Sequence, residues 1–199
     1  MKWKNKSQHD SDSEDDSDCE CENECVRVNS TDIYFYGDVN NENILDLISD
    51  LKTLERKLLK KAVDLPGYNP VITLHIKSDG GDVYAGMSAL DHLEKMRIHV
   101  HTVAEGCCAS AATFLLLGGH KRFVTKRCQL LIHQLSSGFW GKYEEIKDEV
   151  KTCEQLMKMI KQIYTEKTNI PPKKLKAMMK RDIYLSSQEC VEYGIAACL

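Results

Sequence analysis

The sequence lacks any long apolar run. Its longest apolar stretch, within residues 111–117, is far shorter than the roughly 18 consecutive apolar residues expected of a membrane-spanning helix. The chain opens with basic residues (MKWKNKSQHD), but no apolar core follows them, so we expect no secretory signal. These absences predict a cytoplasmic protein with no membrane partner.

A strong charge of one sign is missing from most of the chain. The formal net charge is −3 at pH 7, and residues 1–24 contribute −6, from three lysines and nine acidic residues. The rest of the chain therefore carries +3. A nearly neutral body gives no electrostatic reason to expect nucleic acid binding.

Acidic and serine residues fill the N-terminal segment, which includes SDSEDDSDCECENEC. Such a segment repels itself and cannot bury apolar surface, so we predict a disordered tail at 1–26 and one domain at 27–199. Cys19, Cys21 and Cys25 lack paired CxxC spacing and a nearby histidine, which favours an interaction or solubilising tail over a metal site. The nine cysteines are an odd number, and we expect them to be reduced thiols.

Strand and helix patterns alternate along the domain. The periodicity predicts strands at 31–37, 71–76, 97–104, 121–125 and 128–132. It also predicts a helix that is capped at Asn40 or Asn41 and stops before Leu65, further helices at 83–96, 111–117, 142–167 and 171–180, and a last short helix after 186. This order predicts an α/β fold built from repeated βαβ units. The mostly apolar strand at 71–76 suggests a parallel sheet that is covered on both faces.

The helix expected at 142–167 is unusually long. Its apolar residues alternate by three and four, and a helix of that length exceeds what a domain of this size needs to cover itself. This pattern predicts packing against another chain or a second helix, and so favours an oligomer.

Ser110 lies where a strand meets a buried helix, within EGCCASAATFLLLGG, which begins at Glu105. The unpaired amides of a helix N-terminus can hold a negative charge, so a serine there can be a nucleophile with a backbone oxyanion site. The same small residues also suit close helix packing. Gly80-Gly81 and Ser110 each follow a strand, and the carboxyl ends of parallel strands share one edge, so these loops should face each other.

A serine nucleophile needs a base and a carboxylate that orients the base. His133 and Asp182 each lie at a junction between expected elements, and both could fill these roles. Each also has an ordinary structural explanation, as a hydrogen-bonded strand end or a turn residue. Spacing alone does not choose between these interpretations.

Four segments change that balance: IKSDGGDVYAGM, EGCCASAATFLLLGG, LLIHQLSSG and KRDIYLSSQECVEYGI. In this order and spacing, over about 32–199, the chain resembles the proteolytic subunits of the Clp protease family (ClpP), which are ATP-dependent serine peptidases. The resemblance implies a ClpP/crotonase-like fold with a protruding handle at about 135–167. It also implies that Ser110, His133 and Asp182 are the nucleophile, the base and the orienting carboxylate.

The resemblance extends to binding residues and partners. It implies that the amides of Gly81 and Ala111 hold the oxyanion, and that an extended peptide lies beside Gln134, Leu135 and Ser136. It matches Arg181 to an arginine that bridges rings in a homo-oligomeric double ring. It implies protein or peptide substrates and no cofactor, with ATP used only by a Clp-type AAA+ unfoldase.

Several positions depart from the family pattern. Asp79 replaces the proline of the SPGG turn, Ala111 stands where methionine is usual, and His75 replaces a tyrosine of the cleft that docks the ATPase. The acidic tail replaces the usual axial loop. These departures keep open a peptidase that acts on a dedicated partner, such as a viral assembly protein, without a Clp ATPase. A crotonase-like acyl-CoA enzyme and an idle ring subunit are further alternatives, and the complete Ser110, His133 and Asp182 set argues against both.

Overall fold

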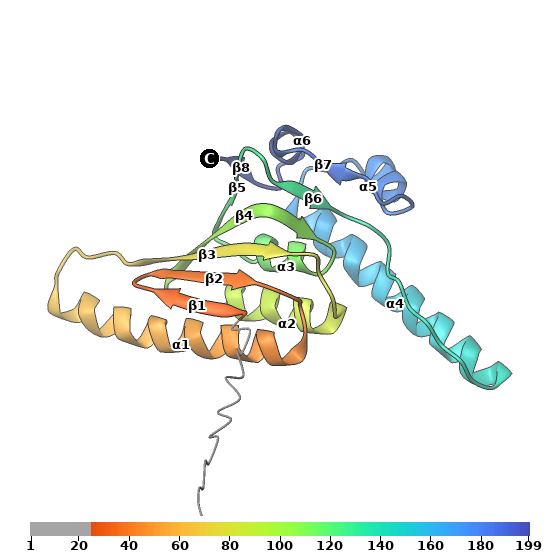
Figure 1. Ribbon diagram of the computed structural model, residues 1–199, viewed down its shortest axis with the longest axis horizontal. Helices are drawn as coiled ribbons and strands as arrows, with labels where there is room; N and C mark the ends of the chain where they lie inside the picture. Colours follow the sequence, from red (N-terminus) through yellow and green to blue (C-terminus); the bar gives the residue numbers. More distant parts are fainter. Residues whose placement is uncertain (1–24) are drawn as a thin grey trace, which may run out of the picture.

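Eight strands form one mixed sheet in the computed structural model, which describes residues 25–199 (Figure 1). The strands are β1 Val26–Asn29, β2 Asp32–Tyr36, β3 Val71–Ser78, β4 His99–Ala109, β5 Lys121–Val124, β6 Gln129–Leu131, β7 Tyr184–Leu185 and β8 Ala197–Cys198. The main order is β1-β2-β3-β4-β5-β8, and β6 pairs with the end of β4 and with β7. The pairings from β2 to β5 are parallel, as the repeated βαβ order predicts.

Six helices accompany the sheet in the described part of the chain. They are α1 Asn41–Asp64, α2 Val83–Glu94, α3 Ala112–Leu117, α4 Tyr143–Lys167, α5 Pro172–Met178 and α6 Ser187–Glu192. Helices α1 and α2 lie along one face of the sheet, whereas α4 projects away from it (Figure 1). This arrangement confirms the predicted α/β fold.

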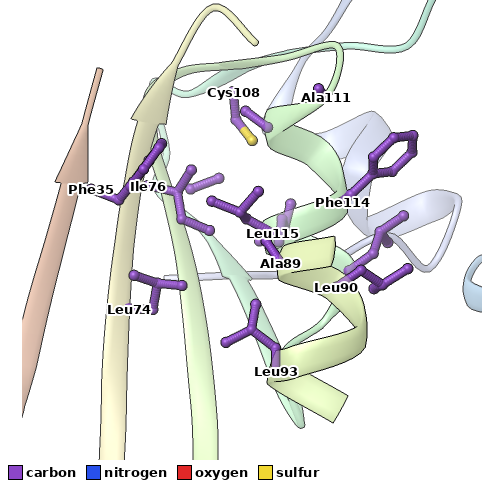
Figure 2. Packing of buried hydrophobic residues seen from close by; sticks show 14 of the residues in the cluster. Phe35, Leu74, Ile76, Ala89, Leu90, Leu93, Cys108, Ala111, Phe114 and Leu115 are labelled. Carbon is purple, nitrogen blue, oxygen red and sulfur yellow. The ribbon is translucent and has the colours of Figure 1, made fainter. Parts of the chain in front are cut away.

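The core lies between the sheet and its helices. Leu93 of α2 and Leu115 of α3 lie toward Leu74 and Ile76 of β3, whereas Leu90 lies on the far side of α2, near Phe114 (Figure 2). The helix α1 begins at a side-chain cap, because Oδ1 of Asn40 accepts a hydrogen bond from the amide of Asn43 at 2.8 Å. Its buried residues then recur at spacings of three and four, as the sequence periodicity predicted.

The opposite face of the sheet is only half-covered by this chain, so the prediction of two covered faces was wrong. Along β3, Ile72, Leu74 and Ile76 are buried, while Thr73 and His75 between them are half-exposed. Alternation along a strand sends successive side chains to opposite faces. The apolar run therefore describes only one of the two faces.

The N-terminal boundary also differs from the sequence prediction. Strand β1 begins at Val26 and pairs antiparallel with β2, and the carbonyl oxygen of Cys25 accepts a hydrogen bond from the amide of Tyr36. The last residue of the predicted tail is therefore part of the sheet. Residues 1–24, with Cys19 and Cys21, lie outside the described part of the chain.

The handle helix α4 is buried only near its C-terminal end. Leu156, Ile160 and Tyr164 are buried, whereas Tyr143 and Val150 in the outer half are exposed. Within residues 25–199, none of the helices is both long enough and apolar enough to cross a membrane.

Candidate active site

The ends of β3 and β4 bring the glycine turn against Ser110. The parallel register pairs Ser78 with Cys108, so two residues later Gly80 lies beside Ser110. A Cβ atom added to Gly80 would lie 2.6 Å from the Cβ of Ser110, which is closer than side chains can approach. Gly80 has a φ of 100°, so the turn requires glycine for both space and backbone conformation. The two loops thus meet, as their positions after strand ends predicted.

Ser110 is held in a left-handed backbone conformation, with a φ of 55°. This conformation costs a non-glycine residue roughly 1–2 kcal/mol. Its amide donates to the carbonyl oxygen of Leu131 at 2.9 Å. Its carbonyl oxygen accepts from the amide of Thr113 at 3.0 Å and from Oγ1 of Thr113 at 2.7 Å. Hydrogen bonds on both sides therefore fix the strained residue between β4 and α3.

The pairing of β6 with β7 places Asp182 opposite His133. Strands β6 and β7 are antiparallel, with Leu130 paired to Leu185 and Leu131 to Tyr184. Continuing this register by two residues sets His133 across from Asp182. The ring Nδ1 of His133 lies 3.7 Å from Oδ1 of Asp182, which is an ion-pair distance and longer than a hydrogen bond.

Both side chains are partly open to solvent. The Asp182 side chain is 78% exposed and that of His133 is 22% exposed. Within residues 25–199, no hydrogen bond joins the Ser110 hydroxyl to the His133 ring, although both residues line one pocket. Catalytic hydrogen bonds are often long in unliganded sites and shorten when substrate binds.

Two backbone amides beside Ser110 have no acceptor among residues 25–199: those of Gly81 and Ala111. Gly81 has a φ of 143°, and a Cβ atom there would lie 2.3 Å from the carbonyl oxygen of Val39. The neighbouring amides of Val39 and Asp82 are hydrogen-bonded across this bridge. The bridge fixes Gly81 while leaving its amide free to bind an oxygen atom.

A pocket of about 400 Å³ joins these groups to the handle. It is lined by Gly81, Asp82, Val83, Tyr84, Ser110, Ala111, Phe114, residues 133–137, Glu149, Thr152, Cys153, Leu156, Ile160 and Tyr164. Gln134, Leu135 and Ser136, the residues expected to lie beside a peptide, are on its wall. The amide of Gln134 donates to the carbonyl oxygen of Met179, and the amide of Leu135 donates to the sulfur of Met157.

Comparison with known proteins decides which family these features represent. A family model for Clp protease matches residues 26–198. The chain belongs to the Clp protease family. A solved structure of a ClpP1 point mutant from Listeria monocytogenes is similar, with a TM-score of 0.73 and 27% sequence identity. The match covers 85% of this chain and 91% of that chain. Membership of the family implies a ClpP-like serine peptidase.

The apolar side of the pocket was missed by the sequence analysis. Phe114 follows Ser110 on α3, and Leu156, Ile160 and Tyr164 come from the buried end of α4. The three-and-four spacing in α4 marked one apolar face, but a spacing does not show that part of the face lines a pocket. Thr113 was also missed, although a hydroxyl inside an apolar helix requires a hydrogen-bond partner.

Two thiols near the end of β4, those of Cys107 and Cys108, are poor nucleophiles. All seven cysteines within residues 25–199 are free. Burial, together with a hydrogen bond to Asp79 and its charge, raises the pKa of Cys107 to about 11. Burial also raises the pKa of Cys108 well above its usual value. Among the described residues, no group of three or more His, Cys, Asp or Glu side chains could hold a metal ion.

Proposed function

We propose that this chain is a serine endopeptidase in which Ser110 is the nucleophile, His133 the general base and Asp182 the orienting carboxylate. Gly81 and Ala111 supply the oxyanion amides, and residues 134–136 bind the peptide. The observation that carries this proposal is that β3, β4 and β6 end, and β7 begins, at the same edge of the sheet. Their registers bring Gly80 to within contact of Ser110 and His133 to 3.7 Å from Asp182.

The proposed reaction is acyl transfer through Ser110. His133 takes the proton of the Ser110 hydroxyl as its oxygen attacks the peptide carbonyl carbon. The Gly81 and Ala111 amides donate to the resulting oxyanion, which is worth roughly 3 kcal/mol per donor in comparable enzymes. His133 then protonates the leaving amine, the C–N bond breaks, and water hydrolyses the acyl-serine ester. The reaction uses only these groups and water, so the proposal includes no cofactor.

The proposal places this chemistry inside a homo-oligomeric chamber. Proteins of this family form oligomeric proteolytic chambers. In this chain the outer half of α4 leaves apolar side chains uncovered, with Tyr143 73% and Val150 52% exposed. Uncovered apolar surface of this kind favours an interface. Arg181, beside the exposed Asp182, is the proposed contact between rings, and a Clp-type unfoldase is the proposed source of unfolded substrate.

Fluorophosphonate labelling of the assembled protein tests the nucleophile. Wild-type protein should become labelled on Ser110, and Ser110→Ala should not. The Ser187→Ala variant is a suitable control, because Ser187 is a buried serine whose hydroxyl bonds the carbonyl oxygen of Lys126. Absence of labelling in assembled wild-type protein would overturn the proposal.

A second candidate function is a ClpP-like peptidase that serves a dedicated partner without a Clp ATPase. The observation that favours it is the set of polar contacts around His75. Nδ1 of His75 lies 2.8 Å from Oε1 of Glu105, its Nε2 lies 3.7 Å from Oδ1 of Asp32, and its ring stacks on Tyr34 with centroids 4.5 Å apart. An apolar docking segment would have to desolvate this network.

Degradation of a folded, tagged protein distinguishes the two candidates. If a Clp ATPase with ATP drives this degradation, the ATP-dependent function stands. Cleavage of short peptides without ATPase-dependent degradation supports the dedicated partner. The His75→Tyr variant is informative in both cases, because it should leave peptide cleavage unchanged and alter only the response to the ATPase.

A further inference from the structure

A buried hydrogen-bonded chain runs from the handle helix to the nucleophile. The hydroxyl of Tyr164, on α4, lies 2.5 Å from Oγ1 of Thr113 on α3. Oγ1 of Thr113 in turn donates to the carbonyl oxygen of Ser110 at 2.7 Å. Tyr164 is 2% exposed and Thr113 is fully buried, so both hydroxyls are shielded from solvent.

The direction of each hydrogen bond follows from counting protons. Thr113 has one hydroxyl proton, and the Ser110 carbonyl oxygen can only accept, so Thr113 donates to it. Oγ1 of Thr113 must then accept from Tyr164. Burial raises the pKa of Tyr164 far above its usual value, which keeps this phenol protonated.

Hydrogen bonds also fix the C-terminal end of α4, which carries Tyr164, to the rest of the domain. The carbonyl oxygen of Tyr164 accepts from the amide of Thr168 at 3.0 Å and from its Oγ1 at 2.6 Å. Arg122 on β5 donates to the carbonyl oxygen of Lys167 at 2.6 Å. The base of α4 is therefore fixed, while its outer half projects from the body (Figure 1).

The other end of this series of hydrogen bonds is at Ser110, whose backbone is strained. Ser110 has a φ of 55°, and its carbonyl oxygen is one of the two backbone groups that hold it there. A left-handed residue persists only when its surroundings hold it in place. Loss of one hydrogen bond to this carbonyl oxygen would let the peptide unit rotate and move the hydroxyl and the adjacent Ala111 amide.

We infer that Tyr164 and Thr113 are positioning residues that hold Ser110 in its reactive conformation and couple it to the base of the handle helix. This inference rests on the proposed function, because it assigns a reactive role to Ser110. The two residues act through the Ser110 backbone and need not touch the substrate.

Three variants test the chain: Tyr164→Phe, Thr113→Val and the double variant. Thr113→Val removes the side-chain hydrogen bond to the Ser110 carbonyl oxygen, whereas Tyr164→Phe removes the donor that fixes the Thr113 hydroxyl in its orientation. Neither change creates a large cavity. We expect the rate constant for fluorophosphonate labelling and kcat for a peptide to fall about tenfold, with KM changed by less than about twofold. The double variant should be no slower than Thr113→Val, because both changes break the same chain.

Two further variants separate positioning from general stability. Thr113→Ser keeps the hydroxyl and should retain wild-type labelling within about threefold, whatever its melting temperature. Thr165→Val removes a hydroxyl from the same helix at an exposed position, where it bonds the Lys161 carbonyl oxygen, and should leave the rate unchanged.

The outcomes separate failure of this inference from failure of the proposed function. If wild-type Ser110 is labelled and Tyr164→Phe reacts at the wild-type rate in assembled protein, the coupling is wrong and the peptidase stands. Additive effects in the double variant, or a Thr113→Ser variant as slow as Thr113→Val, would also overturn the coupling. If wild-type Ser110 is not labelled at all, both proposals fall. If Tyr164→Phe does not fold, the labelling rates of Thr113→Ser and Thr113→Val decide whether the Thr113 hydroxyl positions Ser110.

Discussion

Asp182 faces His133 because the antiparallel register of β6 and β7 continues two residues beyond its last pair. The two side chains are 3.7 Å apart, and the carboxylate is largely exposed. An exposed carboxylate attracts an imidazolium less than a buried one, since water screens the charge. The contact should therefore tighten if assembly covers Asp182.

The first prediction concerns this carboxylate. Asp182→Asn keeps the shape of the side chain but removes the charge that stabilises imidazolium, and its amide can stabilise the wrong His133 tautomer. We expect kcat/KM for a peptide to fall by roughly 10³–10⁴-fold, with the oligomeric state unchanged. Steady-state peptide cleavage and analytical ultracentrifugation measure the two quantities.

A matched control for this change is Asp91→Asn on α2. The Asp91 side chain is 67% exposed and forms only a 4.0 Å contact with Lys95. It should keep full activity. An Asp182→Asn variant as active as Asp91→Asn would show that another group orients His133.

Sequence patterns found the long elements better than the short ones. Helices α1, α2 and α4 can be predicted from the sequence, because apolar residues recur along each of them at spacings of three and four. Strand β7 has only two residues, and it is a strand because Leu185 and Tyr184 pair with β6. No local propensity predicts such a strand, so its register, which places Asp182, could not be read from the sequence.

In the candidate site, too, some residues could be predicted from the sequence and others could not. Ser110, His133 and Asp182 could be named because the family motifs contain them. The Tyr164–Thr113 contact joins residues 51 positions apart on two helices, and neither motif nor spacing connects them. The length of β4 was also underestimated, because Gly106, with a φ of 59°, interrupts a strand that continues to Ala109.

The second prediction concerns the glycine turn. In Gly80→Ala the new Cβ would meet the Ser110 Cβ at 2.6 Å and the Ala109 carbonyl oxygen at 2.7 Å, at a φ of 100°. We expect fluorophosphonate labelling to be lost and the protein to be destabilised by about 2–4 kcal/mol. Labelling and urea unfolding measure both effects.

Gly138→Ala is the control for this turn, because a Cβ atom there would meet nothing within 4 Å. It should label at the wild-type rate. Normal labelling of Gly80→Ala would mean that the turn and Ser110 can move apart without loss of function.

The third prediction concerns the thiol beside the glycine turn. Burial, and then Asp79, raise the pKa of Cys107 to about 11, so only roughly 1% of it is thiolate at pH 9. Alkylation by iodoacetamide, followed by mass spectrometry, should be slow at Cys107 and faster at the exposed Cys198. Asp79→Asn removes a charge that opposes the thiolate and should speed alkylation of Cys107 at pH 9. Equal alkylation rates at Cys107 in both proteins would show that Asp79 does not raise the pKa of Cys107.

The fourth prediction concerns stability in mild acid. Burial lowers the pKa of His101, and the neighbouring Lys121, His99 and His120 lower it further. The folded state therefore resists protonation that the unfolded chain accepts near pH 6.5, so the free energy of unfolding should fall as pH drops through that value. In His101→Gln the difference in unfolding free energy between pH 7.5 and pH 5.5 should be smaller than in wild type. Urea unfolding at one protein concentration measures it, and an unchanged difference would show that His101 does not contribute to the acid sensitivity.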